Sequence, residues 1–136
     1  MRVAVVDGQG GGIGKLIVAR LKKSLPDVHV IALGTNALAT LAMLKAGADQ
    51  GATGENAIRV TVAEVDVVAG CLGIVLANSM LGELTTQMAE AISSTKAKKI
   101  LLPINRCGVD IIGVDVSEPL PAMIDALVEQ VAVLLN

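Results

Sequence analysis

Short aliphatic runs and longer segments with apolar residues every three or four positions alternate along the chain. The short runs predict strands and the periodic segments predict helices. Strands are expected at Val3–Val6, His29–Leu33, Gln50–Thr53, Asp66–Gly70 with a continuation toward Leu76, Lys99–Ile104 and Asp110–Val114. Helices are expected at Ile13–Ser24, Ala37–Ala46, Glu55–Ala63, Ser79–Ser93 and Leu120–Leu135.

This alternation predicts an α/β fold, a Rossmann-like three-layer sandwich with a mainly parallel sheet. Parallel crossovers of helical length and uninterrupted apolar strands indicate a sheet covered on both faces. The expected strand order is 3-2-1-4-5, and the strand after Cys107 either adds an edge strand or pairs as a hairpin. With 136 residues and no linker, the chain is expected to form one domain over residues 1–136.

A dense glycine turn joins the first expected strand to the first helix. Glycine leaves no Cβ between the backbone amides and a ligand, and a helix start carries a positive partial charge. The turn therefore predicts a binding site for an anion, with Arg106 or Lys15 as the charged partner. The residues assigned to it are Gly8, Gln9, Gly10, Gly11, Gly12, Ile13 and Gly14.

The spacing of the glycines separates the known nucleotide-binding loop motifs. The plain G-x-G-x-x-G pattern fails, and Gly8, Gly12 and Gly14 instead resemble the G-x-x-x-G-x-G turn of short-chain dehydrogenases. A P-loop is disfavoured because Gln9 replaces its first glycine and Leu16 its magnesium-binding hydroxyl. The simpler interpretation is a turn that lets helix and sheet pack closely.

The composition argues against dehydrogenase chemistry. The chain contains no Phe, Tyr or Trp, so the tyrosine that serves short-chain dehydrogenases as general acid is absent. The second expected strand ends in Gly34-Thr35-Asn36, with neither the acid that holds an NAD ribose nor a basic residue for an NADP phosphate. Thr35 and Asn36 are better explained as N-caps of the next helix.

The charge and cysteine content limit the classes of binding partner that are expected. A net charge of −2, with no basic block and no aromatic residues, argues against nucleic acid. The short N-terminal apolar run is unlike a signal peptide, and glycines interrupt the longest uncharged stretch, so a cytoplasmic location without membrane contact is expected. Cys71, Cys107 and the single histidine predict neither a disulfide framework nor a metal site.

Polar residues gather where the expected strands end. In an open α/β sheet the ligand crevice lies beyond these carboxyl ends, so they are predicted to converge on one site. Taken singly, each is also an ordinary turn or cap residue, and Arg106 is the one suited to clamp a phosphate or carboxylate. The candidates beyond the glycine turn are Asn36, Glu55, Asn56, Asn78, Asn105 and Arg106.

Two of the expected helices have more apolar surface than packing against one face of the sheet would bury. The helix after Asn36 is apolar almost all round, and the last helix has a wide aliphatic stripe. Because large apolar patches are uncommon on monomers, a homo-oligomer is expected.

Several stretches resemble a small bacterial family catalogued as a domain of unknown function. They span nearly the whole chain, and the resemblance implies a stand-alone cytoplasmic protein of Rossmann-like fold without indicating a reaction. The stretches are residues 7–15, 32–37, 43–48, 51–58 and 103–107.

Two functional hypotheses remain open. In the first, the chain binds a nucleotide, dinucleotide or phosphorylated metabolite at the Gly8–Gly14 loop, with Glu55 or Asp7 as acid or base if a reaction follows. In the second, it is a non-catalytic oligomeric or regulatory module whose glycine loop serves packing. A perturbed carboxylate in a crevice favours the first, and a glycine loop filled by side chains favours the second.

Overall fold

The computed structural model describes residues 1–105, 107–115 and 117–136. It contains a five-stranded, all-parallel sheet with strand order β3-β2-β1-β4-β5, as the sequence predicts. The strands are β1 (Arg2–Asp7), β2 (His29–Gly34), β3 (Gln50–Thr53), β4 (Val67–Cys71) and β5 (Lys98–Leu102). The helices are α1 (Gly12–Ser24), α2 (Ala37–Lys45), α3 (Glu55–Val62), α4 (Thr86–Ser94) and α5 (Leu120–Leu134), with short 3-10 turns η1 (Leu72–Val75) and η2 (Met80–Gly82).

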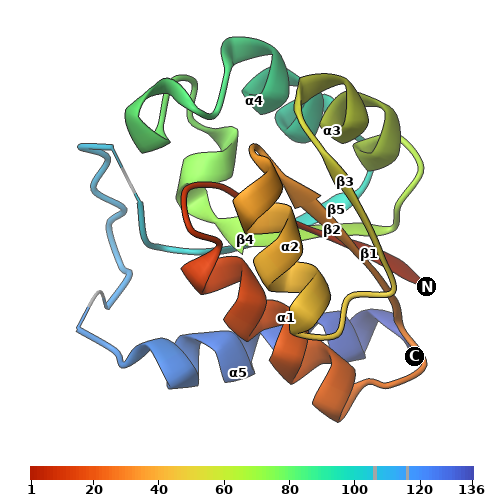
Figure 1. Cartoon of the computed structure of the whole chain (residues 1–136). Coiled ribbons are helices and arrows are strands. Elements are labelled where there is room, and N and C mark those ends of the chain that lie inside the picture. Colours follow the sequence, from red (N-terminus) through yellow and green to blue (C-terminus); the bar gives the residue numbers. More distant parts are fainter. Residues whose placement is uncertain (106, 116) are drawn as a thin grey trace.

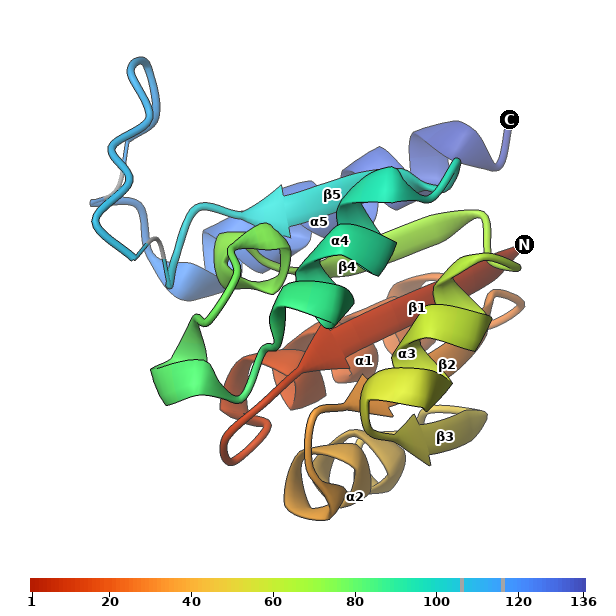
Figure 2. The same cartoon turned by 90° about the horizontal axis from the view of Figure 1, so that it is seen from above.

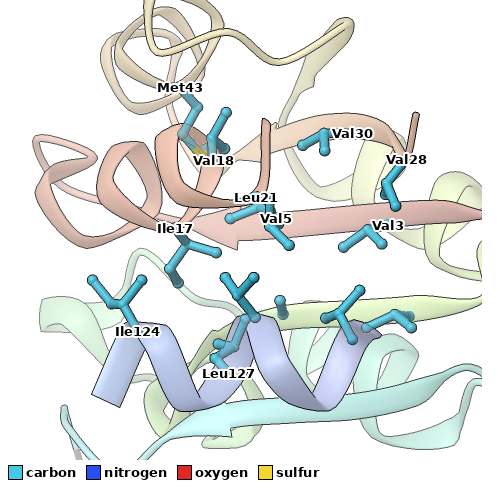
Figure 3. Packing of buried hydrophobic residues seen from close by; sticks show 14 of the residues in the cluster. Val3, Val5, Ile17, Val18, Leu21, Val28, Val30, Met43, Ile124 and Leu127 are labelled. Carbon is cyan, nitrogen blue, oxygen red and sulfur yellow. The ribbon is translucent and has the colours of Figure 1, made fainter. Parts of the chain in front are cut away.

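Helices cover both faces of the sheet and form three layers (Figure 1). Helices α1, α2 and α5 pack on one face, and α3 and α4 pack on the other. Each face has its own apolar core, and Figure 3 shows Ile17 and Leu21 of α1 meeting Ile124 and Leu127 of α5 beside β1. Burial of these aliphatic side chains is the main favourable term in such a fold, at about 1.5–3 kcal/mol each.

The glycine turn, η1, η2 and the segment after β5 all lie at the carboxyl ends of the strands (Figure 2). The two chain ends lie on the opposite side. In the order 3-2-1-4-5, β2 and β3 are added on one side of β1, and β4 and β5 on the other. The order of the strands therefore reverses between β1 and β4, and parallel α/β sheets bind their ligands at such a point.

The region after β4 differs from the sequence prediction. The continuation toward Leu76 and a helix from Ser79 are both wrong, because β4 passes into η1 and α4 begins only at Thr86. Leu81 and Gly82 have φ values of 57° and 91°, which a right-handed helix cannot include. Helix α4 starts where the Thr85 hydroxyl accepts a hydrogen bond from the Met88 amide at 3.1 Å.

The predicted strand Asp110–Val114 is also wrong. A turn stands there, in which the Val114 amide donates to the Ile111 carbonyl at 3.3 Å and Gly113 has a φ of 90°. Within the described residues no strand follows β5, so β5 is an edge strand. The β-branched composition of this segment misled the prediction, because glycines at 108 and 113 favour turns.

Candidate functional site

The glycine turn is held by its own backbone and by contact with α2. The Gly8 carbonyl accepts from the Gly11 amide at 2.9 Å, and Gly11 has a left-handed φ of 70°. A Cβ at Gly11 would lie 3.0 Å from the Ala39 backbone, and one at Gly14 would lie 2.6 Å from the Met43 sulfur. These two glycines are therefore needed for α1 to approach α2 and the sheet.

Asp7, the last residue of β1, places its carboxylate at the start of α1. Its Oδ1 accepts from the Gly8 amide at 2.8 Å, and its Oδ2 accepts from the Gly14 amide at 2.6 Å. Burial raises the pKa of Asp7 above the ordinary value of 3.8, and the amides of Gly14, Gly8 and Ile13 offset part of this rise. Part of the amide set at this helix start is thus already taken by the chain itself.

The raised pKa of Asp7 predicts a pH-dependent cost to folding. A buried acid with a raised pKa binds its proton more tightly in the folded state, so its ionisation favours the unfolded chain. The free energy of unfolding of the wild type relative to D7N is expected to fall as pH rises from 3.8 through the folded pKa, and then to level off. Urea denaturation followed by circular dichroism across this range measures the difference.

The D7N variant is the matched reference, because all other titrating groups are shared and cancel in the comparison. A difference that instead grew with pH would mean that the amides outweigh burial and that Asp7 is held as a stabilised carboxylate.

Glu83 reaches the glycine turn from the segment after β4. Its Oε1 accepts from the Gln9 amide at 2.9 Å, from Thr35 Oγ1 at 2.7 Å and from Asn36 Nδ2 at 2.7 Å. The Gln9 amide and Thr35 hydroxyl lower the pKa of Glu83 below 4.5, so it is a carboxylate at neutral pH. One oxygen thus joins the loops that follow β1 and β2.

Sequence reasoning missed Glu83. The expectation that no acid stands beyond β2 holds for the residues directly after that strand, but the fold brings a carboxylate there from 48 positions away in the chain. The available signal was an acid inside the turn Gly82-Glu83-Leu84-Thr85, at the carboxyl end of β4.

Asn36 contacts this carboxylate directly, and Glu55 contacts the nearby Thr85. Asn36 caps α2, because its side chain accepts from the Ala39 amide at 2.9 Å, and it also donates to the Gln9 carbonyl at 3.0 Å. Glu55 accepts from the Thr85 hydroxyl at 2.7 Å, so the segment from Glu83 to Thr85 contacts the loops after β1, β2 and β3. The predicted N-cap at Asn36 is confirmed.

Of the other candidates, Asn78 and Asn105 follow β4 and β5 at the same edge. Asn78 adopts a φ of 66° just before the η2 turn, and its backbone N–H donates to the Leu84 carbonyl. Asn105 donates to the buried Cys71 sulfur at 3.5 Å, and burial raises the pKa of this thiol. Asn56 lines a hollow between α3 and α4, away from the glycine turn. Arg106 lies outside the described residues.

Gly10 and Gly12 differ from the other glycines of the turn. Neither has a positive φ, and a Cβ at either position would meet nothing within 4 Å. Both residues are exposed, and neither backbone amide donates a hydrogen bond within the described part of the chain. The fold itself therefore does not require glycine at these two positions.

Two further kinds of site are absent from the described residues. No three histidine, cysteine or acidic side chains in that part of the chain gather closely enough to hold a metal ion. Of its helices, none combines the length and the apolar character needed to cross a bilayer.

The chain belongs to the DUF3842 family, a domain of unknown function, whose model matches residues 2–136. No curated protein matches it. Among solved structures it is similar to a dodecameric FMN-dependent UbiX-like decarboxylase from Escherichia coli O157:H7, at 13% identity and a TM-score of 0.49, over 97% of this chain and 95% of that one. At that level the similarity transfers neither flavin nor reaction to this chain.

Proposed function

We propose that the protein binds a nucleotide or another phosphorylated metabolite at the glycine turn, with the amides of Gly10 and Gly12 facing the phosphate. The observation that carries this proposal is that these two glycines are exposed and unexplained by packing. A ligand that approaches the backbone closely accounts for both, because any side chain would stand in its way.

The carboxylates nearby are compatible with an anion. Asp7 is buried, and both of its carboxylate oxygens are directed to the amides of Gly8 and Gly14. Glu83 keeps its negative charge, and three neutral donors in the loops after β1 and β2 hold its Oε1 in place. Lys15, exposed in the first turn of α1, supplies a positive charge, and Arg106 remains the second candidate from the sequence.

The absence of aromatic residues gives a direct first experiment. A chain without Phe, Tyr or Trp contributes almost nothing to absorption near 260 nm, so such a band in the purified protein comes from a bound molecule. Mass spectrometry of the supernatant after denaturation then identifies it. Protein purified without any such molecule would move the test to added ligands.

Substitution at Gly12 separates binding from folding. G12V is expected to weaken calorimetric binding of ADP by at least about 10-fold, since its side chain fills the approach to the amides. G12A is expected to leave the free energy of unfolding within about 1 kcal/mol of wild type, because its Cβ meets no neighbour and alanine favours a helix start.

A19V is the matched control for this substitution, because it adds a comparable side chain to the same helix at an exposed position away from the turn. It is expected to bind ADP as the wild type does. If neither ADP, inorganic phosphate nor sulfate binds, and nothing is carried through purification, the proposal fails.

The packing hypothesis also has a specific observation in its favour. Gly8, Gly11 and Gly14 allow close contact with the Thr35 hydroxyl, the Ala39 backbone and the Asp7 Cβ respectively. In that case the turn is an architectural element of a non-catalytic, self-associating module. Exposed Leu38 and Leu41 on α2 support self-association, and G12V would then change neither binding nor assembly.

A further inference from the structure

We call the described residues between β5 and α5, namely 103–105, 107–115 and 117–119, the connecting segment. They project beyond the sheet (Figures 1 and 2). Ile112 stands at the tip of its turn and is 96% exposed. Val109, Ile111 and Val114 on the same short segment are exposed as well. Single exposed aliphatic residues are ordinary, but four on one projecting segment form an apolar knob that water disfavours.

A hollow of about 230 Å³ lies at the base of this segment, between β5 and α5. It is smaller than the roughly 300–1,000 Å³ of a typical small-molecule site, and its size suits aliphatic side chains. The edge strand β5 forms one wall, and its outer side has no strand partner in the described part of the chain. Most of the lining is apolar, including Ile100, Leu102, Met123, Ala126 and Leu127, and its polar members are Asp115, Glu118 and Gln130.

Charge is distributed unevenly around the knob and the hollow. Residues 96–99, at the start of β5, contain three lysines. Residues 107–136, which include most of the connecting segment and all of α5, contain five acidic residues and no lysine or arginine. Asp125 is ion-paired with Arg20 of α1, and Asp115 and Glu118 line the hollow, so these last two carboxylates are the ones that the lysines at the start of β5 in another copy would attract.

We propose that the β5 edge is an interface between two copies of this chain, in which Ile112 of each copy enters the hollow of the other. A two-fold contact requires the knob and the hollow on the same face of the molecule, and Val114 and Asp115 of the connecting segment line that hollow. Both unpartnered apolar features are then buried, and the acidic segment of each copy approaches Lys98 and Lys99 of the other. This contact is distinct from the α2 surface and does not depend on the glycine turn.

Light scattering with refractive-index detection tests the proposal on the full chain, since the protein lacks aromatic absorption. The wild type is expected to be dimeric or larger at micromolar concentration, and I112D is expected to weaken association about 100-fold. A126E, which places a charged side chain from an exposed helix position into the hollow, is expected to do the same. V60D, at an exposed aliphatic position of α3, is the matched control and should leave the assembly unchanged, whereas L38D tests the α2 surface as the alternative interface.

A second measurement uses I112W, which introduces the only tryptophan in the chain. Its fluorescence should shift to shorter wavelength as protein concentration rises, because the indole leaves water on association. The proposal is overturned if the wild type is monomeric, if I112D and A126E remain associated, or if L38D alone dissociates the protein. None of these results bears on ADP binding, so the proposed ligand function is judged separately.

Discussion

Replacing Gly34 with alanine is expected to destabilise the fold by about 3 kcal/mol or more. Gly34 ends β2, and a Cβ there would lie 2.6 Å from both the Asn36 carbonyl oxygen and the Thr40 backbone nitrogen. Both atoms belong to backbone that the start of α2 fixes in place, so neither can move as a flexible side chain could. The loss is a large share of the roughly 5–15 kcal/mol by which domains are stable.

Urea denaturation followed by circular dichroism measures this effect, and G10A is the matched control. Gly10 lies in the neighbouring loop with open space around its Cα, so the same substitution there should change the free energy of unfolding by less than about 1 kcal/mol. Equal stability of the two variants would show that the loop after β2 adapts freely, contrary to the packing described above.

The sheet could be predicted from the sequence because each of its strands is a clear local signal. Runs such as Val3–Val6 and His29–Leu33 are bounded by glycine or polar residues, and helical segments follow them. Right-handed crossovers then leave few possible strand orders, and 3-2-1-4-5 is confirmed.

The segment after β4 could not be predicted because its apolar residues serve two different purposes. Met80 and Leu84 are buried and spaced as on a helix, but they belong to a left-handed turn and to the chain that follows it. Periodicity reports burial and not backbone conformation, so a buried turn imitates a helix. The strand predicted at Asp110–Val114 in the connecting segment was wrong for a related reason. Its β-branched residues favour a strand only where a partner strand is available.

The site was predicted in outline but not in its contacts. The sequence indicates that polar residues collect at the carboxyl ends of the strands, and Gln9, Asn36 and Glu55 do lie along this edge. It could not indicate which amides the chain uses for itself. The carboxylates of Asp7 and Glu83 accept hydrogen bonds from the backbone amides of Gly8, Gly14 and Gln9. The amides of Gly10 and Gly12 donate no hydrogen bond within the described residues.

Replacing Glu83 with alanine is expected to lower the free energy of unfolding by about 3 kcal/mol. One carboxylate oxygen of Glu83 accepts three hydrogen bonds. Charge-assisted bonds contribute about 1.5–3 kcal/mol each, and water replaces part of this contribution in the variant. The loss is expected to concentrate in the segment that Glu83 ties down. Hydrogen exchange should therefore quicken most in residues 77–84, where Asn78, Met80 and Leu81 already hold unfavourable positive φ values.

The effect of E83A should depend on pH in the opposite sense to that of D7N. An acid with a lowered pKa contributes stability above its unfolded value, here 4.5, and loses it as pH falls through the folded value. The difference between wild type and E83A should thus be full at neutral pH and shrink in acid. E90A, which removes an exposed acid from α4, is the matched control and should show neither the destabilisation nor the faster exchange. A pH-independent loss in E83A would mean that the side chain acts through packing, and that its charge does not hold the loops after β1 and β2 together.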